Sequence, residues 1–108
     1  MPLSSPGHPL SYPNDLSCSW TVCGSNRRIT IAIIEFQTEK GYDFLTIGNG
    51  KETTPESKVA TLSGTIKIRR VTTMTADAWL QMTSDSSGSA GGFLLKLNHV
   101  ANIEGKFG

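Results

Sequence analysis

Short runs in which apolar and polar residues alternate recur along the chain, and no stretch shows the 3.6-residue period of an amphipathic helix. In the first run, Cys18, Trp20 and Val22 share one face while Ser19 and Thr21 point away, as in a strand with one buried face. The other runs cover residues 29–36, 44–47, 59–62, 65–71, 78–83 and 93–97. Many short strands between turns, with no helices, predict an all-β fold of the β-sandwich type.

The second run requires an irregularity. Ile29, Ile31 and Ile33 keep a period of two, but Phe36 returns to their face only if one residue is skipped, as at a β-bulge. After it, Lys40-Gly41 has the form of a two-residue hairpin turn. We therefore expect a bulge and then a tight connection to the next strand.

Length and charge narrow the function classes. A chain of 108 residues is long enough for one domain and too short for two ordinary cores. Ten Lys and Arg against nine Asp and Glu give a net charge of +1, so we expect no nucleic-acid partner. No apolar run approaches the roughly 20 residues of a membrane helix, so we expect no membrane insertion. Alternation ends near residue 97, which predicts a domain over residues 1–97 and a tail or linker over residues 98–108.

Residues 5–16 contain three prolines and lead directly into the first strand. Because proline fixes φ and restrains the residue before it, such a lead loses little entropy when it is ordered along the sandwich edge. We expect Tyr12 and Trp20 to be scaffolding residues. Cys18 and Cys23 are too few for a zinc site, and on one extended strand they lie about 16 Å apart, beyond disulfide reach.

Four motifs, in this order, resemble those of the CUB domain family. "SPGHPLSYPNDLSCSW" resembles the family's Ser-Pro-x-x-Pro, Tyr-Pro and Cys-x-Trp entry, and "RITIAIIEFQTE" resembles the strand that follows, with an acidic end at Glu39. "GYDFLTIGNG" resembles the Tyr-Asp-x-Leu-x-Ile segment through Tyr42 and Asp43, and "SDSSGSAGGF" resembles the closing loop through Asp85 and Ser86. The resemblance implies an extracellular, antiparallel two-sheet, jelly-roll-like sandwich that binds other proteins and does not catalyse.

The resemblance also shows what is missing. The family usually carries two disulfides, and Cys18 matches a cysteine whose partner would precede residue 1, which implies a truncated or absent N-terminal strand. The positions of the other bridge fall near Lys40 and Ser63, and neither is a cysteine here. Cys23 has no counterpart in the family and is left as a free or intermolecular thiol.

Many CUB domains hold one Ca²⁺ at one end of the sandwich. The resemblance makes Glu39, Asp43, Asp85 and Ser86 the candidate ligands, with carbonyl groups and waters completing the 6 to 8 oxygens that calcium takes. It also implies that a Lys or Arg of a protein partner pairs with the exposed ligand carboxylates. Tyr42, beside Asp43, belongs to the same predicted partner-binding surface.

Alternatives to this ligand set stay open. The connection from Glu39 to Asp43 is about four residues shorter than in the family, so a tight hairpin could turn the two side chains to opposite faces and let Glu35 serve instead. Lys40 could neutralise the cluster without a metal. A solvated acidic rim, or an Asp43 that caps a turn, is an equal alternative to calcium binding.

Two further surfaces are candidates. Trp79 is out of phase with its apolar neighbours, which predicts an exposed indole that contacts a protein partner; a register error or cover by a neighbouring loop is the alternative. The local basic excess offers a site for a sulfated glycan, in a calcium-independent carbohydrate- or glycosaminoglycan-binding module of the seminal-plasma type. Its residues are Lys58, Lys67, Arg69 and Arg70. The structural interpretation of this row is a solvated strand face that protects a sheet edge.

Catalysis is not expected. The two histidines, His8 and His99, lie in the proline-rich lead and in the expected tail, and no Gly-x-Ser-x-Gly elbow exposes a serine nucleophile.

Overall fold

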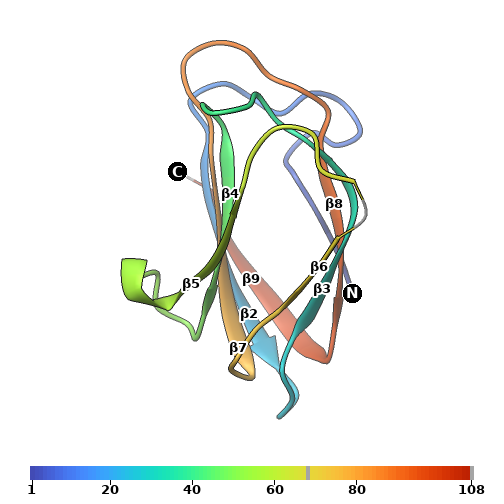
Figure 1. Cartoon of the computed structure of the whole chain (residues 1–108), viewed down its shortest axis with the longest axis vertical. Helices are drawn as coiled ribbons and strands as arrows, with labels where there is room; N and C mark the ends of the chain where they lie inside the picture. Colours follow the sequence, from blue (N-terminus) through green and yellow to red (C-terminus); the bar gives the residue numbers. More distant parts are fainter. Residues whose placement is uncertain (68, 108) are drawn as a thin grey trace.

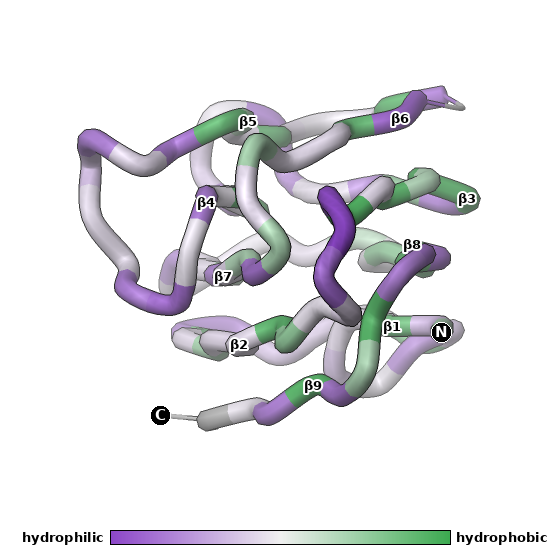
Figure 2. Tube along the Cα trace, turned by 90° about the horizontal axis from the view of Figure 1, so that it is seen from below, coloured by the Kyte–Doolittle hydropathy of each residue, from purple (hydrophilic) through white to green (hydrophobic). Residues whose placement is uncertain are grey.

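A computed structural model describes residues 1–67 and 69–107. Residues 106 and 107 are described by their backbone alone. The described residues form two antiparallel sheets stacked as two layers (Figures 1 and 2), with the orders β1-β8-β3-β6 and β5-β4-β7-β2-β9. The strands are β1 (Pro2–Ser4), β2 (Ser17–Gly24), β3 (Thr30–Gln37), β4 (Phe44–Asn49), β5 (Lys58–Leu62), β6 (Arg69–Thr72), β7 (Asp77–Thr83), β8 (Gly92–Asn98) and β9 (Val100–Phe107). The one helical element among the described residues is a 3-10 turn, η1 (Pro55–Ser57). The predicted all-β, two-sheet antiparallel sandwich is confirmed.

The core lies between the two sheets and is filled by alternate residues of the strands. In β2 the three predicted inward residues, Cys18, Trp20 and Val22, are buried. Trp20 meets Phe93 of the facing sheet edge to face, with ring centroids 5.9 Å apart, a favoured aromatic geometry. The alternation in the sequence therefore identified the core face of this strand correctly.

Strand β3 contains the predicted bulge. Its register against β8 shifts between Ile33 and Glu35. Ile34 is 50% exposed, whereas Phe36 is buried and stacks on Phe93 with centroids 6.1 Å apart. The extra residue lets the strand return an aromatic side chain to the core after the period of two has been broken.

Two strands were missed by the sequence pattern. β1 is only three residues long, and the expectation that residues 98–108 form a tail or linker is wrong for most of that segment. β9 pairs antiparallel with β2 along its whole length, from Gly24↔Val100 to Cys18↔Phe107. Val100 and Ile103 are its only half-buried residues over the described side chains 100–105, so it lacks the alternation that reveals a strand. The sheet thus continues past residue 97.

The proline-rich lead crosses one end of the sandwich (Figure 1). At its start, Ser5 N donates to Phe93 O at 3.0 Å, and Phe93 N donates to Ser5 Oγ at 3.0 Å. At its end, Leu16 N donates to Ser84 Oγ at 2.8 Å and Ser84 N donates to Leu16 O at 3.0 Å. Tyr12, in the middle, is buried. The lead is therefore tied down at both ends, as expected of a scaffold.

Both cysteines are free thiols, so the prediction that they do not pair with each other is confirmed. Burial of Cys18 in β2 raises the pKa of its thiol, which lowers its thiolate fraction. No helix in the described ranges is long and apolar enough to cross a membrane.

Candidate metal centre

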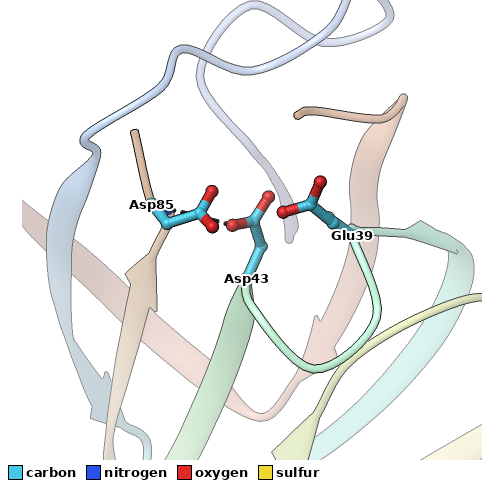
Figure 3. A group of neighbouring side chains, drawn as sticks. All are labelled: Glu39, Asp43 and Asp85. Atoms are coloured by element: carbon cyan, nitrogen blue, oxygen red, sulfur yellow. Dashed lines mark hydrogen bonds between the residues drawn. The ribbon is translucent and has the colours of Figure 1, made fainter. Parts of the chain in front are cut away.

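Three carboxylates meet at the end of the sandwich that the lead crosses. Glu39 follows β3, Asp43 precedes β4 and Asp85 follows β7, and one carboxylate oxygen from each lies within 4.8 Å of the others (Figure 3). Strands β4 and β7 are antiparallel neighbours, with Phe44 opposite Thr83. That register places Asp43 beside Asp85, while the chain brings Glu39 across from the other sheet.

The connection between β3 and β4 puts Glu39 and Asp43 on the same side. The backbone N–H of Asp43 donates to Glu39 O at 3.0 Å and that of Tyr42 donates to the same oxygen at 3.2 Å. This is one helix-like turn, in which residues four apart share a face. Gly41 closes it at φ +82°, a conformation that glycine adopts without steric cost. The predicted two-residue hairpin is wrong, and the alternative in which Glu39 and Asp43 point to opposite faces does not occur.

Asp43 is completely buried, and both of its carboxylate oxygens accept hydrogen bonds. Tyr12 Oη donates to Oδ2 at 2.5 Å, and Asp85 N donates to Oδ1 at 3.0 Å. Tyr12 Oη in turn accepts the N–H of Glu39 at 3.1 Å. Burial and the bond to Asp43 raise the pKa of Tyr12 to about 12. The phenol thus links the lead to two of the three acidic residues.

Glu39 experiences the charges of the other two acids. Its pKa is raised by partial loss of solvent, by the negative charges of Asp85 and Asp43, and by a hydrogen bond with Asp85. Gly88 of the closing loop lies against it, because a Cβ at that position would stand 1.7 Å from Glu39 Oε2. Gly88, at φ +81°, thus lets the closing loop approach the Glu39 carboxylate closely. A cation among the three carboxylates would remove their mutual repulsion.

Hydrogen bonds hold the turn where the family's second disulfide is missing. Gly41 N donates to Ser63 Oγ at 2.9 Å, and that hydroxyl donates to Asp43 O at 2.8 Å. Thr38 Oγ1 also donates to Asp43 O, at 3.1 Å, and accepts the N–H of Gly64 at 2.9 Å. Half-buried Ser63 and buried Thr38 therefore fasten residues 38–43 to residues 63–64 without a covalent link.

Of the other residues predicted around this site, some lie beside the three acids and one does not. Glu35 lies outside the cluster, since its carboxylate pairs with His8 Nε2 at 2.7 Å. Tyr42 is 64% exposed beside Asp43, and Lys40 is exposed on the same turn. Ser86 follows Asp85 and is exposed, and its role as a ligand stays a prediction. The predicted acids Glu39, Asp43 and Asp85 are thus together, and the alternative ligand Glu35 is not with them.

Trp79 is not a surface residue. It is only 2% exposed, and its indole Nε1 donates to Ser57 Oγ of η1 at 2.9 Å. The ring lies over Gly48 of β4, where a Cβ would come within 2.0 Å of it. The prediction of an exposed contact residue is therefore wrong, and the alternative of cover by a neighbouring loop is what the structure has. The residue is out of phase because it packs on the outer face of its sheet beneath the segment that contains η1.

The basic residues are spread over two sheets. Arg69 and Arg70 are exposed on β6 at the edge of one sheet, and Lys58 is exposed at the start of β5 at the edge of the other. Figure 2 shows these two edge strands on the same side of the sandwich. Lys67 is exposed but lies outside any strand, so the strand predicted over residues 65–71 is shorter than expected. Residue 68, within that predicted strand, lies outside the described residues.

Sequence reasoning missed the residues that support the acidic cluster. Tyr12 was predicted only as scaffold, although its hydroxyl bonds the buried carboxylate of Asp43. Ser63 and Thr38 gave no signal, because an isolated hydroxyl residue is common on any surface. The bond between Tyr12 and Asp43 follows from the burial of both residues, because a buried hydroxyl and a buried carboxylate need hydrogen-bond partners, and the sequence does not show that burial.

Comparison with known proteins decides the family. The sequence profile described as "CUB domain" matches residues 1–97 of the chain. The chain belongs to the CUB domain family. Pig (Sus scrofa) cubilin is 29% identical over 103 residues, which cover 90% of this chain and 3% of cubilin. This CUB domain thus spans about 3% of the length of the curated relative it matches.

Solved structures share the fold. The MASP-1 CUB2 domain bound to Ca²⁺ superposes with a TM-score of 0.72 at 22% identity, covering 89% of this chain and 88% of that one. The full extracellular region of zebrafish Gpr126/Adgrg6 gives a TM-score of 0.77 at 23% identity, covering 94% of this chain and 14% of that one. At these identities the likeness establishes the architecture of the CUB domain.

The donor set in this CUB domain fits a hard divalent cation. Carboxylate oxygens are the ligands that calcium prefers, and three of them converge here from separate segments. Asp43 is held by two donors, so its position does not depend on an ion. Calcium is therefore chemically plausible at this end of the sandwich.

Proposed function

We propose that this CUB domain is a non-catalytic, extracellular protein-binding module whose binding surface is organised by Ca²⁺. The observation that carries the proposal is the convergence of Glu39, Asp43 and Asp85 around one point, with Asp43 fixed from behind by Tyr12. The extracellular region of Gpr126/Adgrg6 and the calcium-bound MASP-1 domain, which share this fold, support the setting and the ion.

The buried and exposed parts of the site have different roles in this proposal. Asp43 gives the ion a fixed charged ligand, while Glu39 and Asp85 are half-buried and keep part of their surface in contact with solvent. With the ion bound, these two carboxylates are held in one geometry, ready to pair with a Lys or Arg of the partner protein. Such preorganisation lowers the ordering cost of binding. Exposed Tyr42 would pack on the aliphatic part of the same side chain.

Calcium alone is the first probe. We expect isothermal titration of the apo domain with CaCl₂ to give a saturable one-site isotherm, and we expect CaCl₂ to raise the melting temperature. Asp85→Ala should abolish both effects and keep the fold, because Asp85 is half-buried and its backbone N–H remains. Glu56→Ala, which removes an exposed acid from η1 outside the cluster, is the matched control and should bind like the wild type.

The partner requires a separate measurement. Proteins captured from extracellular fluid by the immobilised domain should fall into a calcium-dependent set, released by chelator and absent with Asp85→Ala. Absence of both heat and thermal shift at millimolar Ca²⁺ would leave an acidic rim as the correct interpretation. Retained capture by Asp85→Ala would show that calcium does not organise the surface.

A further inference from the structure

The last strand is attached to the sandwich in an unusual way. β8 and β9 belong to different sheets, yet a single residue, His99, joins them. His99 has φ +67°, in the left-handed region that non-glycine residues seldom adopt. Its carbonyl accepts the N–H of Ser25 at 3.0 Å. The chain reverses from one layer to the other through this one strained residue (Figure 1).

β9 contributes little side-chain packing. Among residues 100–105, whose side chains are described, none is buried, and only Val100 and Ile103 are half-buried. The strand is held chiefly by its backbone ladder to β2. Its neighbour in the sheet, β2, carries the buried residues Trp20 and Val22, and β2 becomes the open edge of the sheet if β9 leaves without a replacement. β2 therefore requires a strand at this edge, although not necessarily the one from its own chain.

We propose that β9 is an exchangeable strand, so that two copies of this chain form a dimer in which each β9 pairs with the β2 of the other copy. If His99 becomes extended, β8 and β9 run on as one strand over residues 92–107. β9 then points away from its own domain and finds the same register on a second copy. The β2–β9 ladder of the closed chain is regained between the two copies, while the hinge bond from Ser25 N to His99 O is given up and the strained φ at two hinges is relieved.

The hinge predicts the direction of two substitutions. His99→Gly removes the cost of the left-handed conformation and favours the closed monomer, lowering the dimer association constant by roughly a hundredfold, about tenfold for each of the two hinges. His99→Val disfavours that conformation more strongly, because a β-branched residue at positive φ is a clear outlier, and raises the constant by a similar factor. Asp15→Val, the same replacement at another residue with positive φ that joins no exchangeable strand, should leave it unchanged.

A cross-link distinguishes strand exchange from any other dimer. Cys23 of β2 and Asn102 of β9 face each other in the ladder, and facing Cα atoms in antiparallel strands lie within disulfide range. With Asn102→Cys, oxidation should join the two cysteines within one chain in the monomer and between two chains in the exchanged dimer. Cys23→Ser together with Asn102→Cys removes this link and is the control.

The decisive measurement uses two proteins that both keep His99: the wild type and the Asn102→Cys variant. After refolding at high protein concentration, light scattering should show a dimer, and the oxidised dimer fraction should remain a covalent dimer in non-reducing gels. A dimer whose cross-link stays within each chain would overturn the proposal, as would a chain that stays monomeric after such refolding. The junction of β8 and β9 lies at the opposite end of the sandwich from the connection between β3 and β4 (Figure 1), so Asp85→Ala should not alter the dimer fraction.

Discussion

The acidic end and the basic edges of this domain hold charge in opposite ways. At the acidic end, Glu39, Asp43 and Asp85 come from three segments and point to one place, around a carboxylate without solvent exposure. At the basic edges, Arg69 and Arg70 are exposed on one strand, and Lys58 lies in the other sheet. Carboxylates that converge repel one another and need hydrogen-bond donors or a cation to offset the repulsion, whereas basic side chains that are spread over the surface are stabilised by water alone.

This difference favours the acidic end as the binding site. Its geometry is fixed by buried hydrogen bonds through Tyr12 and Thr38 and a partly buried one through Ser63, which an incidental acidic rim would not require. The basic residues have the arrangement expected of edge strands that avoid pairing with another sheet.

Replacement of Asp43 should have the largest effect. Asp43→Ala leaves Tyr12 Oη and Asp85 N without their acceptor inside the protein, so we expect a loss of about 2 to 4 kcal/mol in the free energy of unfolding. Asp43→Asn keeps an acceptor and the volume, and should keep more of the stability while losing calcium affinity. Urea unfolding in the presence of chelator measures the first effect. A loss below about 0.5 kcal/mol for Asp43→Ala would show that the acidic end is no better fixed than the basic edges.

Removal of the Tyr12 hydroxyl should have the next largest effect. Tyr12→Phe loses its hydrogen bond to Asp43, at about 1 kcal/mol of stability. In a Tyr42→Phe background, where Tyr12 is the only tyrosine, ultraviolet absorbance should follow a phenol with a pKa of about 12. Because the folded pKa exceeds the unfolded value of about 10, this stabilisation is present below pH 10 and is lost as the pH rises toward 12. A midpoint near 10 in the folded protein would contradict the buried link.

The pH dependence of Glu39 gives a smaller effect. Its pKa is raised in the folded state, so protonation stabilises the apo domain: the stabilisation is complete below the unfolded pKa of about 4.3 and is lost as pH rises through the folded value. Glu39→Gln should remove this contribution, and the difference in urea midpoint between the two proteins should change over that interval. Calcium affinity of the wild type should fall on acidification, since proton and ion compete for the carboxylate. Parallel pH profiles for the two proteins would show that the three acids do not interact.

Substitution at the basic edge should have the smallest effect. Arg69→Ser with Arg70→Ser should change stability by less than about 0.5 kcal/mol and leave calcium binding unchanged, because both side chains are exposed. On a heparin column, this double variant should elute at the same salt concentration as Arg27→Ser with Arg28→Ser, an exposed pair elsewhere on the surface. Elution at a clearly lower salt concentration for the Arg69 and Arg70 variant alone would favour the glycan-binding function instead.

The parts of the fold that follow from alternation of apolar and polar residues could be predicted from the sequence. The core faces of β2 and β3, and the bulge before Phe36, follow from the positions of apolar residues. The acidic ligands were predicted from their order in the family motifs, since nothing local shows that Asp43 and Asp85 meet. Their meeting depends on the pairing of β4 with β7, which is a long-range contact.

The failures have physical causes of the same kind. Trp79 was expected outside because its phase is outward, but an outward face can still be covered, here by η1 above Gly48. β9 was missed because its stability comes from a backbone ladder, which leaves no trace in side-chain polarity. The turn after Glu39 was misassigned because its length admits both a hairpin and a helix-like turn, and the hydroxyl of Ser63 that accepts the Gly41 N–H lies 22 residues away.

The lead that carries Tyr12 makes the acidic end depend on a segment that contributes no ligand to it. Leu10 in this segment is 75% exposed. A break in the backbone there would leave Tyr12 joined to β2 through residues 13–16 alone. The buried carboxylate of Asp43 would then be held less firmly by its tyrosine donor, although none of the three acids had been removed.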